Sequence, residues 1–464
     1  MSRTARRIRV VVVAATALVC LGASQLTANA ATTVAIDPGT TFQRIDGFGV
    51  SEAFGQANSI RNASSATRQQ ALNMLFGTAN GAGFSILRSI IPSGSDSIEP
   101  KSPGSPSATP TYVWNGNSDA TDQGQLWLAR QAKTYGVTNF YNVAWSAPGF
   151  MKTNGSDSNG GSLCGTSGAS CSSGDWRKAY ANYLVQHAKY WASVGLTPSA
   201  VGFVNEPSLT TSYASMLVSP SQAASFMPTF SAAMKASGLA TKAACCDTLG
   251  FNLLPSYVSA VGNADVGLWT SHGYSSAPSS TINSGGHSVW ESEWGVNGSS
   301  WDTSWDDGST SAGFTWAQRI QTGMTRANLN AFLYWWGISS TGHDSALVSL
   351  SGSTLTASKR YYALANFSRF IRPGATRIGA TSGDSNLTVS AYRNSDGSTV
   401  IAVLNTAQSS VSATYTVSGK STGAVTPYLT NASNSTAAQA AIGLSADAFT
   451  ATVPARSLVT YRIP

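Results

Sequence analysis

The chain has 464 residues, of which 42% are hydrophobic and 11% are charged, and its formal net charge at pH 7 is +7. This length suits one large domain together with a small one. The first thirty residues hold four arginines and no acidic residue, so about +3 (7 − 4) remains for the rest of the chain. So weak a charge excludes a nucleic-acid-binding protein, because such a protein needs a basic surface.

The N-terminal segment 1–30 has the features of a secretory signal peptide. Its arginines precede an apolar run from Val10 to Leu21, and the small residues Ala28 and Ala30 mark a cleavage site. The run is too short to cross a bilayer, and no other segment is long and apolar enough to do so. We therefore expect a secreted, extracellular protein whose mature form has no membrane segment.

The segment 43–372 alternates short β-branched or aromatic runs with longer helical stretches, which indicates repeated βα units. The predicted strands are 44–49, 86–91, 139–145, 200–205, 242–246, 267–273, 288–293 and 331–336. The clearest predicted helices are 64–76, 121–134, 176–194, 221–237, 312–327 and 358–370. Eight strands followed by helices close into a barrel, so we predict an α/β fold, the (β/α)₈ TIM barrel.

The segment 373–464 has a different composition. It is rich in Ser, Thr and Val, and its apolar and polar residues alternate with a period of two. Predicted strands there are 395–405, 410–418, 424–429 and 448–463. They indicate a C-terminal antiparallel β-sandwich domain. The short run Thr32 to Ile36, within the segment 31–42, is expected to join this sandwich, which would make the second domain discontinuous.

Four cysteines remain after removal of the signal peptide, and an exported protein favours disulfides. Cys164 and Cys171 are separated by six residues, so they close easily. Their pairing leaves Cys245 and Cys246 as a vicinal bridge, which needs a strained peptide. A crossed pairing between the two loops is the alternative. No zinc-ligand spacing is present, so we expect no metal and no cofactor.

Two glutamates stand at the ends of predicted strands four and seven. Glu206 ends the run 202–206 and is followed by proline, and Glu293 ends the run 289–293. Hydrolysis of a glycosidic bond needs one carboxylic acid and one carboxylate, so the pair indicates a glycosidase. Glu291 competes with Glu293, because residues two apart on a strand face the same way. A buried Glu291 would need a partner such as arginine, or else a twist of the strand end.

Further polar and aromatic residues near strand ends are candidate substrate-binding residues. Arg88 lies mid-strand facing the barrel interior, where it could hold Glu293 or pair with Glu291. His272 and Tyr274 end strand six, where a tyrosine hydroxyl can reach the nucleophile. Aromatic platforms for sugar rings are expected at Trp145, Trp335 and Trp336, and in loops at Trp114, Trp294, Trp301 and Trp305.

Several motifs resemble glycoside hydrolase family 30 over essentially the whole mature chain. They are Ile45-Asp46-Gly47-Phe48-Gly49, Trp145-Ser146-Ala147-Pro148-Gly149-Phe150-Met151-Lys152, Asn205-Glu206-Pro207 and the C-terminal sandwich. The run Gly47-Phe48-Gly49-Val50-Ser51-Glu52-Ala53-Phe54-Gly55 resembles the xylanase-containing branch typified by fungal members. This resemblance implies retaining double displacement, with Glu206 as acid/base, Glu293 as nucleophile and Asn205 bound to the sugar 2-hydroxyl.

The resemblance implies an endo-β-1,4-xylanase acting on plant polysaccharide as a monomer, with glucuronoxylan as one candidate substrate. Recognition of glucuronate needs basic residues at the cleft, and Arg61 and Lys152 are the first candidates; if neither lies there, a neutral chain is favoured. Alternatives are an endo-β-1,6-galactanase or β-1,6-glucanase of the same family and, in another class, a non-catalytic carbohydrate-binding protein.

Overall fold

The computed structural model describes Met1 and residues 32–114, 122–297 and 300–464. The predicted signal peptide lies outside this part of the chain, apart from Met1. Among the described residues, no helix combines the length and the apolar character that a membrane crossing requires.

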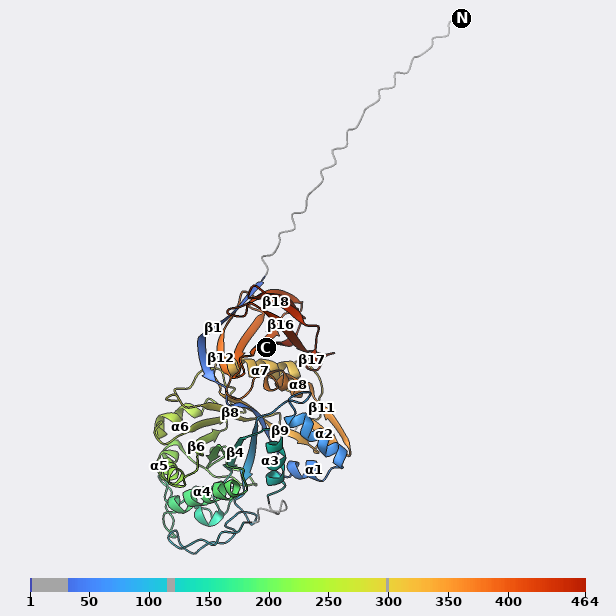
Figure 1. The fold of residues 1–464 in the computed structure, drawn as a ribbon. Coiled ribbons are helices and arrows are strands. Elements are labelled where there is room, and N and C mark those ends of the chain that lie inside the picture. Colours follow the sequence, from blue (N-terminus) through green and yellow to red (C-terminus); the bar gives the residue numbers. More distant parts are fainter. Residues whose placement is uncertain (2–31, 115–121, 298–299) are drawn as a thin grey trace. The chain divides into compact units, whose positions relative to one another are not determined.

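The first sheet is a closed barrel of eight parallel strands, in which the last strand pairs with both the seventh and the first. These strands are β2 (Gly47–Ser51), β3 (Ile86–Ile91), β4 (Asn139–Ala144), β5 (Ala200–Gly202), β6 (Lys242–Thr248), β7 (Leu268–His272), β8 (Val289–Trp294) and β9 (Ala331–Ser339). All eight predicted strands are present, and the predicted TIM barrel with a C-terminal sandwich is confirmed (Figure 1). Buried side chains such as Ile86, Leu268 and Trp290 fill the barrel.

Helices follow the barrel strands and pack a second apolar core against their outer sides. They are α1 (Gln56–Arg61), α2 (Ser65–Phe76), α3 (Gln125–Thr134), α4 (Arg177–Ser193), α5 (Pro220–Ala236), α6 (Leu254–Val261), α7 (Gly313–Thr325) and α8 (Lys359–Ser368). At α5, Ser219 and Gln222 form a capping box and Pro220 occupies the first turn, which fixes where this helix begins. The sequence did not predict α1 and α6, which are short, or the hairpin of β10 (Ala346–Ser351) and β11 (Thr354–Ala357) that extends the sheet at β9.

The remaining strands form the second sheet and its own apolar core. They are β1 (Thr32–Arg44), β12 (Thr376–Ser382), β13 (Leu387–Arg393), β14 (Thr399–Asn405), β15 (Val411–Val417), β16 (Thr422–Thr430), β17 (Ala437–Ala438), β18 (Ile442–Ser445), β19 (Ala448–Val453) and β20 (Ser457–Ile463). β1 pairs antiparallel with β12 and parallel with β15, so an N-terminal strand is part of the C-terminal domain.

One prediction for this domain was wrong: the single strand expected at 448–463 is the pair β19 and β20. The break falls where Pro454 lacks an N–H for the ladder and Arg456 has φ 47°, which is not a strand conformation. In addition, β12, β13, β17 and β18 were not predicted.

Cys164 is bonded to Cys171, and Cys245 to Cys246. This is the first of the two pairings considered above, and the Cys245–Cys246 peptide is cis.

Candidate active site

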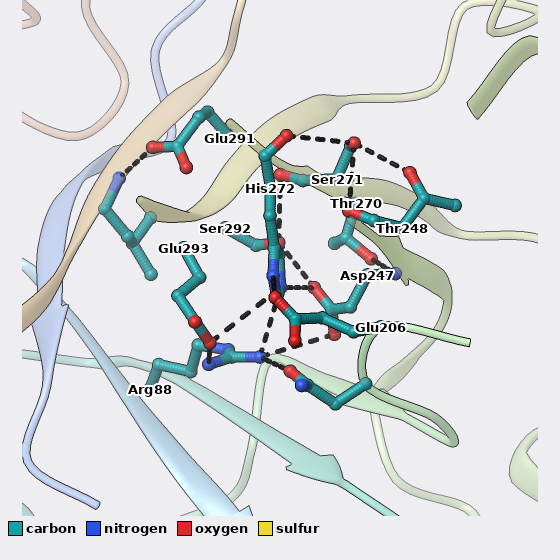
Figure 2. Close-up of polar contacts among 12 residues, drawn as sticks. Arg88, Glu206, Asp247, Thr248, Thr270, Ser271, His272, Glu291, Ser292 and Glu293 are labelled. Atoms are coloured by element: carbon teal, nitrogen blue, oxygen red, sulfur yellow. Dashed lines mark hydrogen bonds and ion pairs between the residues drawn. The ribbon is translucent and has the colours of Figure 1, made fainter. Parts of the chain in front are cut away.

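The site lies at the carboxyl ends of the barrel strands, in a cavity of about 390 Å³. Glu206 follows β5 and Glu293 lies near the end of β8, and both line this cavity. Oxygens of the two carboxylates lie within 4.8 Å of one another. Figure 2 shows both side chains converging on one cluster with Arg88, Asp247 and His272. A short separation of this kind is the one that retaining glycosidases use.

Two hydrogen bonds orient the carboxylate of Glu293. The Arg88 guanidinium donates a short hydrogen bond to Oε2, and the Tyr274 hydroxyl donates to Oε1 at 2.9 Å. Burial raises the pKa of Glu293, whereas the charges of His272 and Arg88 and the hydrogen bond from Tyr274 favour its ionised form. A buried carboxylate held in this way is pre-aligned to attack a carbon atom above it.

Glu206 is held from two sides. Its backbone N–H donates to the carbonyl of Asp247 at 2.8 Å, and its Oε1 lies 3.0 Å from Nδ1 of His272. Its φ is 46°, a conformation uncommon for residues other than glycine and enriched at functional sites. The peptide therefore turns sharply after β5, which directs this side chain into the cavity.

Asp247, near the end of β6, is a charged residue of the site that the sequence did not predict. It is fully buried, accepts short hydrogen bonds from the hydroxyls of Tyr141 and Ser292, and lies 3.8 Å from the Arg88 guanidinium. Burial alone would raise the pKa of Asp247, but Arg88 and His272 lower it below its usual value. The signal that could have found it is a lone aspartate that directly follows a buried run of small residues.

His272 connects the carboxylates through both ring nitrogens. Its Nδ1 faces Glu206, and its Nε2 lies 3.5 Å from Oδ1 of Asp247. Burial lowers the pKa of His272, but Glu293, Asp247 and Glu206 together raise it to about 10. An imidazolium here balances part of the negative charge in the cavity.

Asn205 lies beside Glu206 and Glu293 with its amide oriented by Arg88. The guanidinium donates to its Oδ1 at 2.6 Å, and Asn205 lines the cavity. Because the oxygen is occupied, the amide N–H₂ group is the part that faces a ligand.

Glu291 and Glu293 do not share a face, so that expectation was wrong. The pairing of β8 with both neighbours shifts register between Glu291 and the end of the strand, which reverses the alternation locally. Oε2 of Glu291 accepts from the backbone N–H of Leu333 at 3.2 Å, and its side chain points away from Glu293 (Figure 2). Burial raises the pKa of Glu291 well above its usual value, which favours the neutral acid. Its partner is a backbone amide, and Arg88 pairs with Glu293.

Aromatic side chains form much of the cavity wall. Trp145, Trp335 and Trp336 line the cavity. The sequence placed these three residues at the ends of predicted strands three and eight. Phe54 and Tyr213 also line the cavity and were missed, because both lie in loops, where no strand end marks a side chain as facing the cavity.

Four tryptophans expected in cleft loops do not line this cavity. Trp294 is a strand residue that packs edge-on against Trp316 of α7, and Trp305 is buried and donates to the backbone of Arg456. Trp114 stacks on Tyr190, and Trp301 lies under the guanidinium of Arg360. Packing therefore accounts for Trp294 and Trp305, whereas Trp114 lines a separate hollow, so a cleft extended by Trp114 and Trp301 stays a prediction.

Lys152 is buried at 4% exposure and donates from Nζ to the carbonyl of Ser215 at 2.7 Å. Neither Lys152 nor Arg61 lines the cavity, and none of the described residues that do line it is basic. A smaller hollow adjoins the cavity, and Phe54 lines both of them. Asp96, Asp122 and Asp157 also line this smaller hollow.

Glu206, His272 and Glu293 place three potential ligand atoms within reach of one metal ion. The guanidinium of Arg88 already contacts Glu293 and lies 3.5 Å from His272. A fixed cation inside this set opposes the binding of a second one.

Comparisons with known proteins agree with this geometry. A model described as O-glycosyl hydrolase family 30 matches residues 31–266, and one described as the glycosyl hydrolase family 30 beta sandwich domain matches residues 374–461. The catalytic domain of a family 30 xylanase C from Talaromyces cellulolyticus is 44% identical, with a TM-score of 0.88 over 93% of this chain and 100% of that chain.

Curated relatives include enzymes with two different substrates. An endo-1,6-β-D-glucanase of Trichoderma harzianum is 27% identical over 401 residues, which is 78% of this chain and 78% of that protein. A glucuronoxylanase of Bacillus subtilis strain 168 is 31% identical over 146 residues, which is 31% of this chain and 33% of that protein.

Proposed function

This chain belongs to glycoside hydrolase family 30 and is a retaining glycosidase, and we propose that it is a secreted endo-β-1,4-xylanase that uses Glu206 and Glu293. The observation that carries the proposal is the facing pair of carboxylates, held by Arg88, His272 and Tyr274 in an aromatic cavity.

In the first step, Glu206 donates its proton to the glycosidic oxygen while a carboxylate oxygen of Glu293 attacks the anomeric carbon. The carbon–oxygen bond to the leaving sugar breaks, and a covalent glycosyl-enzyme forms. Glu206, now ionised, then removes a proton from water, and that water attacks the anomeric carbon and releases Glu293. Two displacements on one carbon retain its configuration.

The surrounding residues act by orientation and charge. Arg88 and Tyr274 keep Glu293 aligned for attack, and His272 hydrogen-bonds the carboxyl group of Glu206. The free amide N–H₂ of Asn205 is placed to bind the 2-hydroxyl of the sugar at the reacting carbon. That hydrogen bond strengthens as positive charge develops on the ring.

Xylan is proposed because the xylanase from Talaromyces cellulolyticus is similar over its entire length. A glucuronate side chain is not part of the proposal. The cavity wall has no basic member among the described residues, and the adjoining hollow is lined by aspartates. A carboxylate on the substrate would meet negative charge there, so neutral stretches of the chain suit this cleft better.

A β-1,6-glucanase is the second candidate, because the Trichoderma harzianum enzyme with that activity is similar over 78% of this chain. Incubation with linear xylan, glucuronoxylan, β-1,6-glucan and β-1,6-galactan, followed by analysis of the products, separates these candidates. We expect a ladder of xylo-oligosaccharides. Release of sugars only from a β-1,6-linked glycan would overturn the xylanase proposal, and no release from any of them would favour a binding protein.

Secretion is proposed from the composition of residues 1–30. Expression of the whole chain in a bacterial host, with mass determination of the protein in the medium, tests it. The expected N-terminus is Ala31, directly after the Ala28-Asn29-Ala30 signal.

A further inference from the structure

Two loops on the catalytic face pair with each other like a short sheet. One is the segment 157–161 from the loop after β4, and the other is the segment 211–217 from the loop after β5; together they are called the loop clasp. Backbone hydrogen bonds join Asn159 to Thr211, Ser215 to Asp157, and Leu217 to Gly161, each at 2.8 to 2.9 Å. The clasp therefore holds the loop that follows the acid/base Glu206.

The centre of the clasp is closed by polar side chains. The Ser215 hydroxyl accepts from the backbone N–H groups of Gly160 at 3.0 Å and Thr211 at 3.2 Å. The buried Lys152 donates to the Ser215 carbonyl from below. Burial lowers the pKa of Lys152 to about 8, with Asp157 acting in the opposite direction. A buried ammonium is costly, so its retention under this turn suggests that it fixes the position of the turn.

Tyr213 stands at the tip of the clasp and reaches into the catalytic cavity. Its side chain is 48% exposed although it lines the cavity beside both glutamates. Burial raises its pKa, and so do the negative charges of Glu206 and Glu293. Its ring is thus near the two glutamates, while about half of the side chain stays exposed.

Phe54 faces Tyr213 from the loop after β2. The two ring centroids are 6.1 Å apart, and Phe54 also meets Trp145 and Trp335 edge-on at 5.6 and 5.9 Å. Phe54 is 36% exposed and has φ 55°, which a bulky residue adopts only at a cost. An exposed aromatic ring held in a costly conformation points to a binding role.

We infer that Tyr213 and Phe54 form a sugar-binding platform that sets affinity for the polysaccharide, and that Lys152 is a positioning residue that acts through Tyr213. The inference rests on the proposed function, because it assigns a sugar to these rings. An aromatic face excludes water from the C–H face of a sugar ring, and the hydroxyl of a tyrosine can add a hydrogen bond to the sugar.

Kinetics on xylo-oligosaccharides of two to six units test the platform. We expect Tyr213→Ala to raise KM for the hexamer about tenfold with kcat within about twofold, because it removes binding to a sugar away from the reacting bond. Tyr213→Phe keeps the aromatic ring, so it should raise KM for the hexamer less than Tyr213→Ala does. Phe42→Ala is the matched control, since Phe42 is a 44% exposed aromatic ring on β1 of the sandwich.

Lys152→Met tests the positioning role. We expect the same rise in KM as for Tyr213→Ala and no further rise in the double variant, because one effect passes through the other. Lys420→Met is the control, since Lys420 also donates to backbone carbonyls but in the sandwich domain. If Lys152→Met does not fold, Ser215→Ala disrupts the same turn and takes its place.

Each outcome decides one question. Failure of the wild-type enzyme on every xylo-oligosaccharide would overturn the xylanase proposal, and the platform is then measured on whichever β-linked oligosaccharide the wild type cleaves. Cleavage by the wild type with an unchanged KM in Tyr213→Ala would overturn the platform. Additive losses for Tyr213→Ala and Lys152→Met would overturn the positioning role.

Discussion

The barrel interior has two layers that continue along the same strands but hold opposite kinds of side chain. Near the strand starts lies an apolar layer that includes Ile86 and Leu268. At the carboxyl ends lies a charged layer of Arg88, Glu206, Asp247, His272 and Glu293. On β3, Ile86 and Arg88 are two residues apart and are successive inward-facing residues. The strand therefore passes from the apolar layer to the charged layer between these two side chains.

The two layers use burial in different ways. The apolar layer gains free energy when its surface leaves water. In the charged layer the same burial costs free energy, and the charges are tolerated because each faces an opposite one. The apolar layer should therefore respond to mutation in stability alone, and the charged layer in activity as well as in stability.

The largest effect on activity is expected for Glu293→Gln. The amide keeps the shape, but its single oxygen can accept only one of the two hydrogen bonds that Arg88 and Tyr274 donate to Glu293, and it cannot form the glycosyl-enzyme. We expect kcat to fall at least about 10³-fold, while loss of the charge beside the buried Arg88 lowers the unfolding free energy by no more than ~3–5 kcal/mol. Hydrolysis of xylan at the wild-type rate would contradict both the assigned nucleophile and the division between the layers.

Asp247→Asn should affect both activity and stability. It leaves Arg88 and His272 without their shared carboxylate, so we expect a loss of ~3–5 kcal/mol in unfolding free energy and a fall in kcat of about 10²-fold. Asp344→Asn is the control, because Asp344 is an equally buried aspartate paired with Arg360 at 2.8 Å. If both variants keep the same kcat, Asp247 is only structural.

Leu268→Ala probes the apolar layer. The cavity it leaves should cost ~2–5 kcal/mol of unfolding free energy, whereas kcat and KM below the melting transition should stay close to those of the wild type. Chemical denaturation and steady-state kinetics on one preparation measure both. A large fall in kcat in the folded variant would show that the two layers are not independent.

The pH dependence of stability should report on His272. Its pKa in the folded protein is about 10, above the ordinary value of 6.5. A raised pKa contributes stability that is fully present below pH 6.5 and is lost as the pH rises through about 10. The difference in unfolding free energy between the wild type and His272→Gln should shrink over that window, and a constant difference would rule out an imidazolium at this site.

The smallest effect is expected for Glu291→Gln. Since burial favours the neutral acid at Glu291, an amide of the same shape should change kcat less than about threefold and unfolding free energy by less than ~1 kcal/mol. Paired with Glu293→Gln, it separates two glutamates that lie two residues apart. Equal losses in both variants would place Glu291 in the chemistry.

The barrel strands and the two glutamates that meet in the cavity were predictable because their signals are local. Each strand is an apolar run of the right length, and Glu206 and Glu293 follow such runs directly. The pattern failed where the backbone departs from regular geometry, at Arg456 with φ 47° in the sandwich and at the register shift after Glu291. Alternation assumes an unbroken ladder, and one shifted residue reverses it.

By itself, the sequence determined the order of strands and helices, the two-domain plan and the pair of glutamates at strand ends. Only the tertiary structure decided that Glu293 enters the cavity while Glu291 turns to a backbone amide, and that Asp247 joins the charged layer. It also placed Tyr213 opposite Phe54, two residues separated by more than 150 positions in the chain. These outcomes depend on how strands pair and loops meet, and such contacts join residues that local patterns treat as unrelated.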